Sequence, residues 1–131
     1  MKATLFSIII ATLLIVGVFV FVSIKKGSDS SVSGNINNVS IVDGKQVIEI
    51  NAKGGYSPRV TLAKAGIATV LKVATKGTFD CSAALAIPSI GYRKNLPQSA
   101  ETLVDLPAQE SGSVLQGLCA MGMYNFQIRF N

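Results

Sequence analysis

The sequence predicts an all-β domain, a sandwich or barrel of short antiparallel strands, behind one N-terminal transmembrane helix. The first observation behind this prediction is a run of 22 uncharged residues, 3–24, near the start of a 131-residue chain. The second is that no segment after Lys26 shows the 3.6-residue hydrophobic period of an amphipathic helix, whereas several short segments have β-forming composition. The residues after the uncharged run suit one small domain and not two.

Residues 1–26 are interpreted as an uncleaved membrane anchor. A helix rises about 1.5 Å per residue, so the uncharged run would span roughly 33 Å, enough for a bilayer core of about 30 Å. The alternative is a cleaved secretory signal, whose apolar part is usually about 7–15 residues long and ends in a small-residue cleavage site. Here the run is longer and ends at Lys25 and Lys26. Positive charges on its two sides are nearly equal in number, so charge alone does not fix its orientation.

Residues 27–38 are rich in Ser, Asn and Gly, and this composition predicts a flexible linker. The domain then covers residues 39–131. Its clearest turn is Asp43-Gly44, which separates two runs of β-forming residues and predicts a hairpin.

The clearest strand is the last one, because apolar and polar residues alternate from Tyr124 to Phe130. Such a period of two gives a strand one buried face and one solvated face. Further elements are expected as strands at residues 60–63, 68–74, 102–106 and 113–118, a turn at 54–58, and a short turn of helix at 82–86.

Composition excludes several classes of function. The sequence contains no histidine, so a Ser-His-Asp triad, a His-ligated zinc ion and the usual blue-copper site cannot form. From residue 27 onward, nine Lys and Arg stand against seven Asp and Glu, a net charge of +2 without a basic run. This charge pattern predicts no binding to nucleic acid. No catalytic motif is present either, so the chain is predicted not to be an enzyme.

Four sulfur-containing residues stand out in the predicted domain. Cys119, Met121 and Met123 form the sequence Cys-Ala-Met-Gly-Met in the connection before the last strand, and Cys81 lies in an earlier connection. Flexible methionine side chains, with Gly122 between them, would let the three neighbouring sulfurs converge. Thiolates and thioethers are soft donors that select Cu(I), whereas zinc favours more Cys or His, and calcium or magnesium favour carboxylates.

The two cysteines allow a second interpretation. Cys81 and Cys119 could form a structural disulfide, as in proteins outside the cytosol, or both could be metal ligands. The two methionines beside Cys119 favour the metal site, since a disulfide gives no reason for them. A disulfide-closed structural surface domain remains an alternative, as does a cupredoxin for copper insertion or electron transfer.

Three segments together resemble a known family. They are Gly55-Tyr56-Ser57-Pro58, the loop from Cys81 to Ile87-Pro88, and residues 118–124. These segments resemble the cupredoxin-fold copper proteins and, behind an N-terminal helix, the CupA-like membrane-anchored Cu(I) chaperones and their relatives on copper-exporting P-type ATPases. The resemblance implies a cupredoxin-like Greek-key β-sandwich or barrel preceded by one N-terminal transmembrane helix.

The same resemblance implies a site and a role. Cys81 and Cys119 would hold one Cu(I) ion, and Cys119, Met121 and Met123 a second, so that the two ions share Cys119. The chain would be a chaperone or buffer that sequesters Cu(I) and passes it to a copper-exporting P-type ATPase in the membrane, giving copper resistance. It would be a single-pass protein of the cell membrane, with a monomeric domain outside the cytoplasm.

Overall fold

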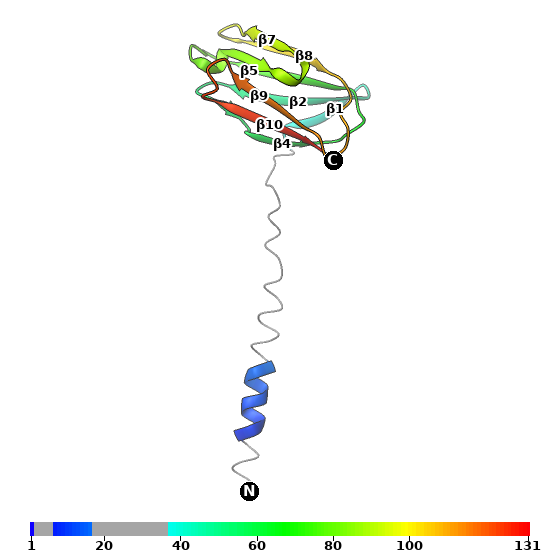
Figure 1. Cartoon of the computed structure of the whole chain (residues 1–131), viewed down its shortest axis with the longest axis vertical. Coiled ribbons are helices and arrows are strands. Elements are labelled where there is room, and N and C mark those ends of the chain that lie inside the picture. Colours follow the sequence, from blue (N-terminus) through cyan, green and yellow to red (C-terminus); the bar gives the residue numbers. More distant parts are fainter. Residues whose placement is uncertain (2–6, 17–36) are drawn as a thin grey trace. The chain divides into compact units, whose positions relative to one another are not determined.

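The structure is a computed structural model that describes residues 1, 7–16 and 37–131. The chain divides into two units, Met1–Val32 and Ser33–Asn131. In the first unit, residues 7–16 are helical. The second unit contains a β domain, whose strands are labelled in Figure 1.

Within the transmembrane anchor predicted over residues 1–26, the structure describes residues 1 and 7–16, and residues 7–16 are helical. These ten described residues account for a rise of about 15 Å, and a bilayer core is roughly 30 Å thick. Among the described residues, no helix is both long enough and apolar enough to cross a membrane. The predicted anchor is therefore wrong, and so is the single-pass location at the cell membrane with an extracytoplasmic domain. The linker predicted over 27–38 lies outside the described residues, apart from its last two.

The described part of the β domain contains ten strands and two short 3-10 helices, η1 and η2. In chain order they are β1 (Val39–Val42), β2 (Lys45–Ala52), β3 (Tyr56–Ser57), β4 (Val60–Ala63), β5 (Thr69–Thr75), η1 (Cys81–Ala83), β6 (Ala84–Ile87), η2 (Pro88–Ile90), β7 (Tyr92–Asn95), β8 (Ala100–Leu106), β9 (Val114–Cys119) and β10 (Asn125–Phe130). They form two five-stranded sheets. One sheet has the order β1-β2-β5-β8, with β3 paired to β2, and the other has the order β4-β10-β9-β6-β7.

Both sheets are mixed. Strand β2 pairs in parallel with β5, and β4 pairs in parallel with β10, while the other pairs are antiparallel. The predicted fold class, an all-β cupredoxin-like Greek-key sandwich or barrel of antiparallel strands behind a transmembrane helix, is therefore wrong. The described residues contain a short helix, no membrane-spanning helix, and parallel as well as antiparallel strand pairs. Parallel strands are joined by long connections and not by tight turns, so no local turn signal in the sequence predicts their pairing.

Several individual elements are confirmed. Asp43 and Gly44 turn between β1 and β2 with φ of 51° and 75°, the pair of positive φ values that a type I′ hairpin turn requires. Strand β10 alternates as expected, with its three apolar residues buried. The strands expected at 60–63, 68–74, 102–106 and 113–118 correspond to β4, β5, β8 and β9. Strands β6 and β7 were not predicted, and β6 occupies most of the segment expected as a turn of helix.

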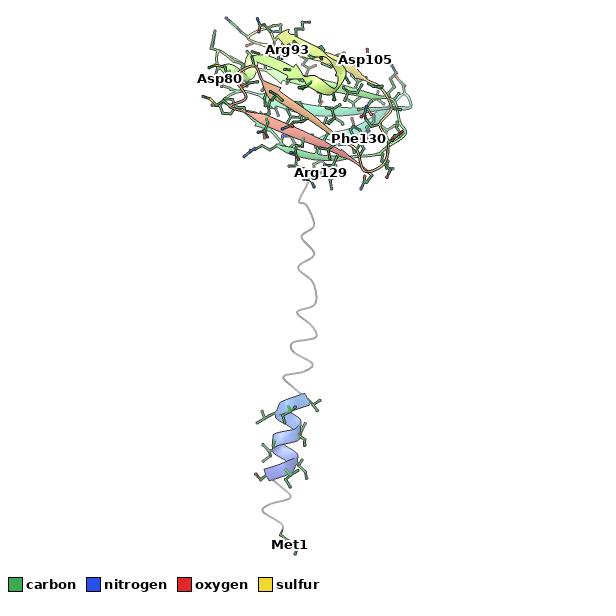
Figure 2. The ribbon with its side chains drawn as sticks, in the orientation of Figure 1. Met1, Asp80, Arg93, Asp105, Arg129 and Phe130 are labelled. Carbon is green, nitrogen blue, oxygen red and sulfur yellow. A yellow bond between two sulfur atoms is a disulfide. The ribbon has the colours of Figure 1, made fainter. Side chains whose placement is uncertain are left out.

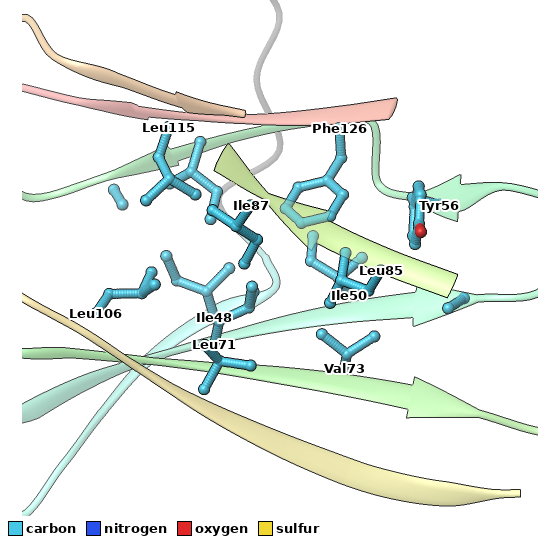
Figure 3. Packing of buried hydrophobic residues seen from close by; sticks show 14 of the residues in the cluster. Ile48, Ile50, Tyr56, Leu71, Val73, Leu85, Ile87, Leu106, Leu115 and Phe126 are labelled. Atoms are coloured by element: carbon cyan, nitrogen blue, oxygen red, sulfur yellow. The ribbon is translucent and has the colours of Figure 1, made fainter. Parts of the chain in front are cut away.

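The buried faces of the two sheets meet in one hydrophobic core (Figure 3). The cluster includes Ile48, Ile50, Leu71 and Val73 from the first sheet, and Leu85, Ile87, Leu115 and Phe126 from the second. Burying a side chain of this size contributes about 1.5–3 kcal/mol to folding. The core therefore holds the ends of β6 and β9 in fixed positions.

Phe126 connects this core to the segment that carries Cys81. It lies opposite Gly117, where an added Cβ would come within 2.2 Å of the Phe126 ring. The Phe126 ring meets the Tyr56 ring edge to face, with centroids 5.1 Å apart. The Tyr56 hydroxyl then donates a hydrogen bond to the backbone carbonyl of Ser82 at 3.1 Å. The residue next to Cys81 is thus bonded to a core side chain.

Candidate metal centre

The pairing of β6 with β9 brings the two cysteines together. Cys81 begins η1, immediately before β6, and Cys119 is the last residue of β9, not part of the following connection as predicted. Leu85 pairs with Cys119, and the Ala120 N–H donates to the Ala84 carbonyl at 2.9 Å. As a result the Cα atoms of the two cysteines are 5.7 Å apart, although 38 positions separate them in the sequence.

The structure joins Cys81 Sγ and Cys119 Sγ in a disulfide. The sequence alone allowed two interpretations of these cysteines, this disulfide or a metal site. The Cα separation lies within the range of about 4.4–6.8 Å found for disulfides. Two electrons and two protons would convert this disulfide into two thiols at the same two positions of the chain.

The two sulfurs differ in their surroundings. Cys119 is fully buried, whereas Cys81 is half-buried at the edge of the core. The backbone N–H of Tyr124 donates to Cys119 Sγ at 3.4 Å. A donor directed at this sulfur supports the negative charge that a thiolate carries. Cys119 is accordingly the better-enclosed sulfur of the pair.

The two methionines lie on a tight turn between β9 and β10. The Cys119 N–H donates to the Tyr124 carbonyl at 3.0 Å, and the Gly122 N–H donates to the Cys119 carbonyl at 2.8 Å. Gly122 has a φ of 69°, which residues with a Cβ rarely adopt. Met121 and Met123 are 82% and 66% exposed. Neither methionine therefore belongs to the core.

Asp80 holds the loop in front of Cys81, and sequence reasoning missed it. Figure 2 places Asp80 at one end of the domain, away from Phe130. Its carboxylate accepts hydrogen bonds from the Ser82 hydroxyl and from the Gly54 N–H, and these bonds, the Ser82 bond above all, lower the pKa of Asp80. An acidic residue two positions before a serine is the local signal that could have revealed this contact.

Tyr56 braces the same loop from the core side. Burial, and secondly the negative charge of Asp80, raise the pKa of Tyr56 to about 12. The hydroxyl therefore stays protonated at ordinary pH and remains a donor to the Ser82 carbonyl. The loop that carries Cys81 is thus fixed both by the core and by the β2–β3 turn.

The donors available near this turn are mainly sulfur. Within residues 1, 7–16 and 37–131, no group of three or more His, Cys, Asp or Glu side chains could hold a metal ion. Beside the two cysteines, the sulfur-containing side chains at this turn are those of Met121 and Met123. The four sulfur-containing residues differ in exposure: Cys119 is buried, Cys81 is half-buried, and Met121 and Met123 are exposed. Thiolates and thioethers of this kind suit Cu(I) and suit zinc or calcium poorly.

The β domain has a fold that occurs in copper-binding proteins. It is similar to the metal-binding domain of the Cu(I)-exporting P-type ATPase CopA of Streptococcus pneumoniae D39, with a TM-score of 0.65 and 22% identity over 74% of this chain and 96% of that domain. A copper-binding protein solved by NMR in its apo form is similar with a TM-score of 0.65 and 22% identity, over 75% of this chain and 97% of that protein. No family model and no curated protein matches the chain. At this identity the likeness shows a shared fold.

Proposed function

We propose that this chain is a Cu(I)-binding protein, a chaperone or buffer that sequesters copper through Cys81, Cys119, Met121 and Met123. The observation that carries the proposal is the placement of two cysteines side by side next to a turn with two exposed methionines. The shared fold with the metal-binding domain of a Cu(I)-exporting ATPase supports it. The proposal is for a binding protein and not for an enzyme.

The four sulfurs would hold two ions that share the Cys119 thiolate. Cys81 and Cys119 form the first site, where two negative sulfurs more than neutralise Cu(I) in a largely buried position. We expect this site to bind tightly. Cys119, Met121 and Met123 form the second site, where two neutral thioethers stand in solvent. We expect the second ion to be weaker and more exchangeable.

We propose a copper-exporting P-type ATPase as the partner that receives the copper, which would give the cell copper resistance. The support is that a domain of such an ATPase has the same fold. The exposed Met121 and Met123 are accessible to the ligands of another protein. Copper would therefore leave through the methionine site, by stepwise exchange of sulfur ligands.

A titration of the reduced full chain tests this proposal. In competition with a chromophoric Cu(I) chelator, under anaerobic conditions, the protein is expected to take up two equivalents of Cu(I). Zinc is expected to bind poorly, because the described residues offer two thiols and no third charged ligand beside them. The control is protein with its disulfide intact, which should lack both sites because they share Cys119. No uptake by the reduced protein would contradict the proposal. Saturation at one equivalent of Cu(I) would contradict the arrangement in which two ions share the Cys119 thiolate.

One observation favours a second candidate function. The disulfide between Cys81 and fully buried Cys119 suits a structural cross-link in a surface domain. A count of free thiols distinguishes the two, in protein prepared without metal and treated with a mild dithiol under native conditions. A purely structural disulfide would resist the reductant, whereas the copper-binding proposal requires two thiols to appear.

A further inference from the structure

A hollow of about 440 Å³ lies beside the methionine turn. Its lining comes from the β2–β3 turn, from β3 and Arg59 just before β4, and from residues 123–125 at the end of the methionine turn. Met123 belongs to this lining, so the hollow shares a residue with the proposed second copper site. The volume lies within the range of roughly 300–1,000 Å³ of sites for small molecules.

Two cations give the hollow its chemical character. Lys53 and Arg59 line it and are exposed, and none of the described residues in its lining is acidic. In the part of the chain that the structure describes, salt bridges join Lys72 to Glu49 and Glu101, and neither Lys53 nor Arg59 takes part in one. A guanidinium offers paired N–H groups that match a carboxylate, and an ammonium adds a second positive charge.

The β2–β3 turn keeps the hollow open and preformed. Gly54 and Gly55 have φ of 60° and 121°, and a Cβ added at Gly55 would lie 3.4 Å from the Tyr124 ring in the same lining. The Gly54 N–H already donates to Asp80, so this turn is fixed without any ligand. The nearby carboxylate of Asp80 accepts hydrogen bonds from this turn and from Ser82, and it is not part of the lining of the hollow.

We propose that this hollow binds the small anionic thiol that delivers Cu(I), a low-molecular-weight carrier with carboxylate groups. The inference rests on the proposed function of the neighbouring copper site. A carrier of Cu(I) holds it through a soft sulfur, and carboxylates complement Lys53 and Arg59. With its carboxylates on these cations, the carrier presents its copper to Met123, which lines the same hollow.

The delivery is a ligand exchange that leaves copper as Cu(I). The bond between copper and the carrier thiolate breaks as bonds to the Met123 thioether and the Cys119 thiolate form. The released carrier thiolate takes up the proton that the Cys119 thiol gives up, and no electron is transferred. Cys119 must be in its reduced form for this exchange.

Charge-removing variants of the reduced full chain test the inference. Cu(I) is offered either on mercaptosuccinate, a thiol with two carboxylates, or on 2-mercaptoethanol, a thiol without charge. For mercaptosuccinate, Arg59→Gln and Lys53→Gln should each slow Cu(I) uptake by about three- to tenfold, and added salt should reduce this difference. For 2-mercaptoethanol, both variants should match the unmodified protein within about twofold, because an uncharged carrier gains nothing from the cations.

Arg93→Gln and Lys94→Gln are the matched controls, because these exposed residues lie on β7 and do not line the hollow. They remove the same charge and should leave both rates unchanged. Equal slowing with the two carriers, or equal slowing by the β7 variants, would overturn the inference.

A copper-free measurement separates this inference from the proposed function. Methylthiosuccinate, in which the sulfur is blocked, should shift the amide NMR signals of Gly54 and Gly55 saturably, and Arg59→Gln should weaken this binding. Absence of saturable shifts would overturn the carrier site, even in a protein that takes up two Cu(I) ions. If the shifts occur but the protein takes Cu(I) from neither carrier, the proposed copper function fails, and delivery through the hollow fails with it.

Discussion

Replacing Cys119 by serine is expected to abolish tight binding of both Cu(I) ions. Its sulfur is the ligand that the two proposed sites share, and a hydroxyl is a hard donor with little affinity for Cu(I). Cys119 is also fully buried at the end of β9, so a solvent-exposed ligand cannot readily take its place. Competition with a Cu(I) chelator should therefore show uptake falling from two equivalents to none.

Cys81→Ser is the matched comparison, because Cys81 belongs to the first site alone. This variant should lose the tight ion and keep one weaker ion on Cys119, Met121 and Met123. Cys119→Ala serves as a second variant, since a serine hydroxyl buried there without a partner would cost about 1–3 kcal/mol of stability. Small and equal effects of the Cys81 and Cys119 substitutions would contradict the shared-ligand arrangement.

Reducing the disulfide is expected to lower the free energy of unfolding by about 4 kcal/mol. The cross-link joins positions 38 apart, and closing a loop of this length removes chain entropy from the unfolded state by about that amount. Guanidinium unfolding of the oxidised and the reduced protein, followed by circular dichroism, measures the difference. A Cys81→Ala/Cys119→Ala double variant is the control, and its unfolding should not respond to reductant.

Copper should restore part of this stability to the reduced protein. An ion that binds only the folded dithiol form stabilises it by about 2.7 kcal/mol when its free concentration is a hundredfold above the dissociation constant. Zinc added at the same concentration should have a smaller effect. Identical unfolding midpoints for oxidised and reduced protein would show that the Cys81–Cys119 cross-link does not stabilise the fold.

Local chemistry accounts for the parts of the fold that the sequence predicted correctly. The Asp43-Gly44 turn has positive φ at both residues, which is the conformation that Asp-Gly favours. Strand β10 alternates between buried and half-buried residues over its whole length, so its two faces are visible in the sequence. Met121 and Met123 precede the start of this alternation, and both are exposed.

Long-range pairing explains most of what the sequence did not predict. Strand β6 is a short apolar run with the sequence Ala-Leu-Ala-Ile, and β7 is largely exposed, so neither shows a period of two. Yet the pairing of β6 with β9 is what brings Cys81 to Cys119. The parallel pairing of β2 with β5 and of β4 with β10 could not be predicted from the sequence either, because the two strands of each pair are distant in the chain.

The basic hollow was missed because its residues come from separate segments. The sequence marked residues 54–58 as a turn, but nothing in it linked Lys53 and Arg59 to Met123. The fold makes this link because β3 pairs with β2 and β10 with β4, which brings the β2–β3 turn beside Tyr124. A site of this kind becomes visible only when the strand order is known.

The assignment of the sulfur ligands is tested most directly by NMR of the methionine methyl groups. The reduced full chain, labelled with ¹³C at the methionine methyls, gives three signals, from Met1, Met121 and Met123. Adding a second equivalent of Cu(I) is expected to shift the signals of Met121 and Met123, while the first equivalent affects them little and Met1 serves as the internal reference. Unchanged signals from Met121 and Met123 in a protein that has bound two equivalents of Cu(I) would contradict the account.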